Sequence, residues 1–112
     1  MDDYPWKITP EKVRKVIENI VAIGRPKQLI LFGSYVRGET NINSDLDVLV
    51  IVDRELPSYR DESVRIRRAL RDIHMPMDIL VISEKKFQEL SQIEGLVYHE
   101  ILNTGEVVYQ AA

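Results

Sequence analysis

The chain has 112 residues, of which 45% are hydrophobic and 29% charged, and this balance predicts a single folded domain over residues 1–112. It has no cysteine and only two histidines, which excludes disulfides, thiolate catalysis and cysteine-ligated zinc, so any metal must be held by oxygen ligands. The net charge of −3 argues against general nucleic-acid binding.

Nothing in the sequence predicts membrane insertion or export. No apolar run reaches the roughly 18 residues that are needed to span a bilayer. Asp2 and Asp3 contradict the basic start of a secretion signal. We therefore expect a cytoplasmic protein with no membrane partner.

The first third of the chain predicts a helix followed by a strand. Thr9 followed by Pro10 is typical of a helix start, and the apolar residues that follow keep helical spacing until Gly24. The apolar, β-prone run 28–32 then predicts a strand, which ends in a tight turn at Gly33.

The middle of the chain carries the strongest strand signal. A polar, turn-rich segment over 39–44 leads into the apolar run 46–52. Ser58 then predicts the start of an amphipathic helix, and 77–82 is a third apolar strand. The apolar face of that helix is expected to carry Val64, Ile66, Leu70 and Ile73.

The last third predicts two helices and a short strand. Ser83 is typical of a helix start, and a further helix is expected from about Glu94 to Leu102, closed by Gly105. A strand at 107–109 completes the series. This order of elements predicts an α/β (α+β) fold with a small mixed sheet flanked by helices.

One stretch is rich in arginine, with Arg60, Arg65, Arg67, Arg68 and Arg71. Acidic residues are interleaved with these arginines, which is typical of a solvated helix face. Contact with a partner or with RNA is the alternative interpretation.

Three aspartates are candidates for a magnesium site. Residues two apart in a strand point to the same face, so Asp45 and Asp47 are expected to lie side by side, where their charges repel unless a cation compensates them. Asp78 lies within the next apolar strand, where an unpaired carboxylate would be expensive to bury. Each acid alone is also explained as a solvated or ion-paired residue. Together they predict a catalytic site for two Mg²⁺ ions.

A glycine–serine turn supplies the complementary half of the predicted site. Gly33 allows close backbone approach, and the Ser34 hydroxyl with nearby backbone amides can bind phosphate oxygens. Arg37, one helical turn later, is predicted either to contact a phosphate or to form a structural ion pair with an acid.

The combined motif resembles a known family. Gly33-Ser34-Tyr35-Val36-Arg37-Gly38, then Ser44-Asp45-Leu46-Asp47, resembles the nucleotidyltransferase superfamily of polymerase-beta-like fold, and within it the minimal nucleotidyltransferases. The resemblance implies that Asp45, Asp47 and Asp78 bind metal and act in catalysis. It also implies that Gly33 and Ser34 bind the triphosphate of ATP.

Members of this family are commonly paired with a HEPN-domain ribonuclease toxin, so the resemblance implies an antitoxin. Such a protein silences the toxin by transferring AMP from ATP to one of its tyrosines, with the acceptor presented by the partner. Two alternatives remain open: a non-catalytic antitoxin that acts by occlusion, and a transferase for a small-molecule hydroxyl.

Overall fold

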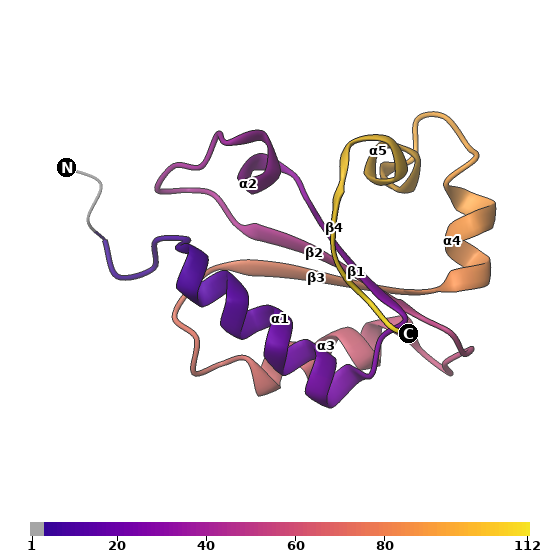
Figure 1. The fold of residues 1–112 in the computed structure, drawn as a ribbon, viewed down its shortest axis with the longest axis horizontal. Helices are drawn as coiled ribbons and strands as arrows, with labels where there is room; N and C mark the ends of the chain where they lie inside the picture. The colour runs from indigo at the N-terminus through magenta and orange to yellow at the C-terminus, as the bar shows by residue number, and fades with distance from the viewer. Residues whose placement is uncertain (1–3) are drawn as a thin grey trace.

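A computed structural model describes residues 4–112 (Figure 1), so Asp2 and Asp3 lie outside the described residues. The elements follow in the order α1 (Pro10–Gly24), β1 (Gln28–Phe32), α2 (Ser34–Arg37), β2 (Leu46–Val52), α3 (Tyr59–Ala69), β3 (Met77–Ser83), α4 (Glu84–Leu90), α5 (Val97–Thr104) and β4 (Glu106–Gln110). No helix of the described part of the chain is long and apolar enough to cross a membrane.

Side-chain caps fix the starts of three helices. Thr9, Ser58 and Ser83 each accept a hydrogen bond from the backbone N–H three residues on, at 3.3, 3.1 and 3.1 Å. Each cap satisfies an otherwise unpaired helix amide. The predicted starts of α1, α3 and α4 are therefore confirmed.

The predicted start of the next helix is wrong. Helix α5 begins at Val97 rather than near Glu94. Gly95 adopts a left-handed backbone with φ of +91°, which interrupts any helix that would run through it. The chain therefore turns before α5 begins.

The sheet has four strands in the order β3-β2-β1-β4. Strand β1 runs antiparallel to both β2 and β4, whereas β2 and β3 are parallel and are joined through α3. The predicted small mixed sheet flanked by helices is thus confirmed, with β3 and β4 at its two edges.

Two cores lie on opposite faces of the sheet. Alternate residues of a strand point to opposite faces, and the even-numbered residues of β2 pack beneath α1 and α3, whereas Leu49 and Ile51 pack beneath α4 and α5. Figure 1 shows these two pairs of helices on either side of the sheet. Odd-numbered residues of β2 therefore face the α4 and α5 side.

Helix α3 buries a narrower stripe than the sequence predicts. Ile66 and Leu70, one turn apart, are fully buried, but Val64 is 39% exposed. Two residues of helix rotate the side chain by about 200°, so Val64 cannot share the buried stripe of Ile66. The prediction that Val64 faces the core is wrong.

Candidate active site

The sheet register brings two of the predicted acids together. Asp47 of β2 is paired with Phe32 of β1 on one side and with Asp78 of β3 on the other. Neighbouring strands lie about 4.8 Å apart, and paired residues point to the same face. The carboxylates of Asp47 and Asp78 therefore project side by side, on the face that α4 and α5 cover elsewhere.

The charge on Asp47 is disfavoured by its surroundings. The pKa of the half-buried Asp47 is raised to about 6, mainly by burial and in addition by the charges of Asp78 and Asp45, while Arg37 opposes the shift. Asp45 is exposed and lies just before β2. All three predicted acids thus interact electrostatically, and a cation among them would relieve their repulsion.

The Gly33 turn lies directly against Asp47. Gly33 has φ of +80° and ψ of −153°, a backbone conformation that is essentially restricted to glycine. A Cβ atom added at Gly33 would collide with Oδ2 of Asp47. Ser34 follows as the first residue of α2. The predicted phosphate-binding turn and the acid cluster therefore form one site.

Arg37 forms an ion pair that the sequence did not reveal. Its Nε donates to Oε1 of Glu39 at 2.7 Å, and the two side chains are 55% and 62% exposed. Of the two interpretations of Arg37, the structure shows an ion pair, although with Glu39 rather than with an aspartate of the cluster. Glu39 lies in the predicted turn-rich segment, where its sequence context gave no signal of a role.

Asp78 is exposed, so the argument from a costly buried carboxylate is wrong. The reason is strand order, because β3 forms an edge of the sheet and Asp78 lies near its start. Within residues 4–112, no group of three or more histidine, cysteine, aspartate or glutamate side chains is already arranged to hold a metal ion. Asp47 and Asp78, together with Asp45, nevertheless offer the oxygen ligands and the negative charge that suit Mg²⁺.

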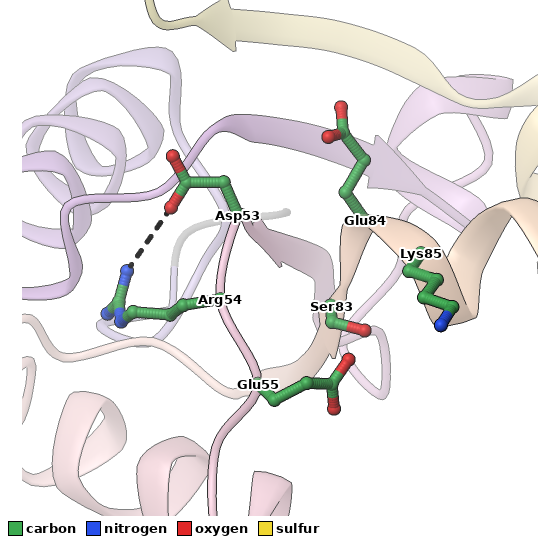
Figure 2. A pocket seen from close by; sticks show the side chains of 6 residues that line it. All are labelled: Asp53, Arg54, Glu55, Ser83, Glu84 and Lys85. Carbon is green, nitrogen blue, oxygen red and sulfur yellow. Dashed lines mark ion pairs between the residues drawn. The ribbon is translucent and has the colours of Figure 1, made fainter.

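A separate hollow of about 230 Å³ lies at the opposite ends of β2 and β3 (Figure 2). Its lining residues are Asp53, Arg54, Glu55, Ser83, Glu84 and Lys85, none of which the sequence predicts as a site residue. Arg54 lies 3.9 Å from the Asp53 carboxylate and donates to the Gly24 carbonyl at 3.1 Å. The buried Ser83 hydroxyl accepts from Tyr59 at 3.0 Å. These groups are engaged in holding the fold.

Two solved structures share this fold. One, a mutant form of the toxin–antitoxin MntA–HpeT, aligns with a TM-score of 0.56 and 17% identity over 93% of this chain and 75% of that one. The other, a toxin–antitoxin with AMP-PNP, gives a TM-score of 0.53 and 20% identity, with coverages of 93% and 75%. At these identities the likeness concerns the fold.

Sequence comparison identifies the family. "Putative protein adenylyltransferase MJ0604" of Methanocaldococcus jannaschii is 31% identical over 86 residues, which cover 77% of this chain and 81% of the relative. "Putative protein adenylyltransferase MJ0141" of the same organism is 36% identical over 73 residues, or 63% and 72%. The family model of the nucleotidyltransferase domain matches residues 11–103. The chain therefore belongs to the nucleotidyltransferase domain family, as its motif predicts.

Proposed function

We propose that this nucleotidyltransferase moves AMP from ATP to a tyrosine hydroxyl of a partner protein, and that the partner is a HEPN ribonuclease toxin which the transfer silences. The observation that carries the proposal is the register pairing of Asp47 with Asp78 directly beside the Gly33 turn. The names of the two relatives support AMP transfer to protein, and the two solved structures described above are of toxin–antitoxin proteins.

The donor nucleotide binds between the glycine turn and the acid cluster in this proposal. Backbone amides near Gly33 and the Ser34 hydroxyl hold the triphosphate, because the glycine conformation lets the phosphates approach the backbone closely. The Arg37–Glu39 pair is exposed, so its exchange for a phosphate contact costs little.

Asp45, Asp47 and Asp78 would hold Mg²⁺, with two ions proposed. The bound metal would supply neutralisation of phosphate charge and activation of the attacking oxygen. Asp78 is exposed and reachable from outside, so we assign it to receive the proton of the acceptor hydroxyl. The acceptor oxygen then bonds to the α-phosphorus as the bond to the bridging oxygen breaks, and pyrophosphate leaves.

The test is transfer to a purified partner. A purified HEPN ribonuclease is incubated with the protein, Mg²⁺ and ATP labelled at the α- or the γ-phosphate. We expect α-label alone on the partner, the mass increase of one AMP on a tyrosine, and reduced RNA cleavage.

An Asp45→Asn variant serves as the control and should leave the partner unlabelled and active. If this variant still silences the partner completely at equal concentration, the partner is inhibited by occlusion and the catalytic proposal is wrong. Label on a small molecule instead of the partner would indicate a small-molecule acceptor.

A further inference from the structure

The positive charge of the chain is concentrated around α3. Between residues 60 and 71 there are five arginines and only two acids, Asp61 and Glu62, although the whole chain has a net charge of −3. We use the name "arginine face" for the outer side of this segment, formed by Arg60, Val64, Arg67, Arg68 and Arg71. The rest of the molecule is correspondingly acidic, so this face differs in charge from its surroundings.

Only one arginine of the segment has a structural task within residues 4–112. Arg65 donates to Glu62 at 2.8 and 2.7 Å and to the Ile23 carbonyl at 2.9 Å, which ties α3 to the end of α1. In the described part of the chain, no hydrogen bond or ion pair engages the guanidinium groups of the arginine face, which are those of Arg60, Arg67, Arg68 and Arg71. Their donors remain available to a ligand.

Three hollows follow the arginine face and share its residues. One of about 510 Å³ is lined by Arg60, Val64 and Arg68 together with Asp61 and Arg65. A second is lined from α3 by Ser63, Val64, Arg67 and Arg68. The third includes Arg67 and Arg71. Because Val64, Arg67 and Arg68 recur, the hollows form a continuous surface along the helix.

The second of these hollows reaches the candidate active site. Its other wall is the start of the edge strand β3, formed by Met77, Asp78 and Ile79. Asp78 is also the register partner of Asp47. A chain segment lying on the arginine face would therefore reach the start of the edge strand β3, next to the residue whose carboxylate we assign to receive the acceptor proton.

We infer that the arginine face is the surface on which the acceptor protein docks, and that the docking segment of that protein is acidic. This inference rests on the proposed function and adds the route by which the acceptor reaches Asp78. Four unpaired arginines attract carboxylates and bind them in bidentate geometry. A docked acidic segment carries the acceptor hydroxyl along the hollow to the edge of the sheet.

The observations favour a protein over RNA as the occupant. The hollow beside Asp78 has apolar walls from Val64, Met77 and Ile79 between its arginines. Apolar contacts at the centre with arginine around them are typical of protein interfaces. RNA binding relies on longer tracks of basic residues against phosphates and on stacking of bases on aromatic rings. Within the described residues, the hollow beside Asp78 has no aromatic residue, and Trp6 and His74 line only the third hollow, whose lining does not include Asp78.

The first test measures docking without nucleotide or transfer. Binding of a fluorescent glutamate–tyrosine copolymer to the full chain is followed by anisotropy, beside a lysine–tyrosine copolymer and single-stranded RNA. We expect the acidic copolymer to bind through the arginine face, whereas any binding of the lysine copolymer to the acidic remainder of the molecule should be unaffected by Arg68→Glu. Arg68→Glu should weaken binding of the acidic copolymer at least about tenfold through charge reversal. Because Arg68 is exposed, the variant should fold, and Arg60→Glu provides a second charge reversal.

Lys85→Glu is the matched control, because it reverses an exposed positive charge on α4, on the other side of the sheet. It should leave copolymer binding unchanged. Equal binding by wild type, Arg68→Glu and Arg60→Glu would overturn the inference. If the RNA binds more tightly than the acidic copolymer and its binding depends on Arg68, the ligand of the arginine face is RNA and not an acidic protein segment.

The second test separates docking from catalysis. With the HEPN partner and Mg²⁺–ATP, Arg68→Glu should label the partner at least about tenfold more slowly than wild type does, with unchanged nucleotide affinity. Labelling at the wild-type rate would overturn the docking inference and leave the proposed function intact. Arg68-dependent copolymer binding without any labelling by wild type would support the docking face and contradict the proposed function.

Discussion

Replacing Asp47 by asparagine should stabilise the metal-free protein, because the fold holds this carboxylate where its charge is disfavoured. Burial and the charges of Asp78 and Asp45 raise its pKa from 3.8 to about 6. At about 1.4 kcal/mol per pKa unit, the ceiling is about 3 kcal/mol. Because Asp47 is only half-buried, solvent screening reduces the expected gain to about 1 kcal/mol.

The stability that Asp47→Asn gains over wild type should increase as the pH rises. Between about pH 4 and pH 6 the folded state binds more protons at Asp47 than the unfolded state does. The wild-type free energy of unfolding therefore falls as pH rises through this window, and above it the penalty is complete. Asp47→Asn has no such titration, so its advantage should be near zero at pH 4 and full at pH 7.5.

Urea unfolding at several pH values in the presence of EDTA measures this difference. In thermal unfolding at pH 7.5, also with EDTA, the melting temperature of Asp47→Asn should exceed that of wild type by about 4 °C. Asp72→Asn, which removes an exposed charge outside the cluster, is the control and should give a small effect. If Asp47→Asn gives no gain in stability, or the same gain at every pH, the stability penalty that we attribute to the charge on Asp47 is refuted.

Three further predictions concern the turn, the metal and the first helix. Gly33→Ala should lower the free energy of unfolding by at least about 2 kcal/mol, since it adds backbone strain and a clash with Asp47. In an Asp47→Ala background, the Gly33→Ala substitution should cost less stability, because the side chain that it would strike is gone. If urea unfolding shows that the losses of the two single variants simply add in the double variant, the contact between Gly33 and Asp47 is contradicted. Removing Mg²⁺ with EDTA should weaken AMP-PNP binding in calorimetry by at least about tenfold, because the acids then repel the phosphates. Equal affinity for AMP-PNP with and without Mg²⁺ would exclude a metal ion that bridges the aspartates and the phosphates. Thr9→Ala should cost about 1 kcal/mol in thermal unfolding through the lost cap, with nucleotide affinity unchanged.

Local signals made much of the fold predictable. The apolar run of β2 and the capping residues Thr9, Ser58 and Ser83 act within a few residues of the chain, and the structure follows them. The spacing from Gly33 to Asp47 was also informative, because the turn and the strand start meet in one site.

Features that depend on strand order or on a local turn were not predictable in the same way. Asp78 is exposed because β3 is an edge strand, and no property of its own segment indicates this. Helix α5 begins later than predicted because Gly95 has a left-handed backbone conformation, and a single glycine in a sequence does not indicate that conformation. Arg37 pairs with Glu39 because of the turn that the chain makes directly after α2, and the sequence does not indicate the direction of that turn.

Paramagnetic NMR can locate the metal–nucleotide site, which we propose to be the acid cluster beside Gly33. Mn²⁺ replaces Mg²⁺ in small amounts with AMP-PNP present, and it broadens the amide signals nearest to the ion. If the metal lies among the three aspartates, the first amide signals to broaden should be those of Gly33, Ser34, Asp45, Asp47 and Asp78. Broadening centred on Asp53 and Glu84, at the opposite hollow of Figure 2, would contradict this location of the metal.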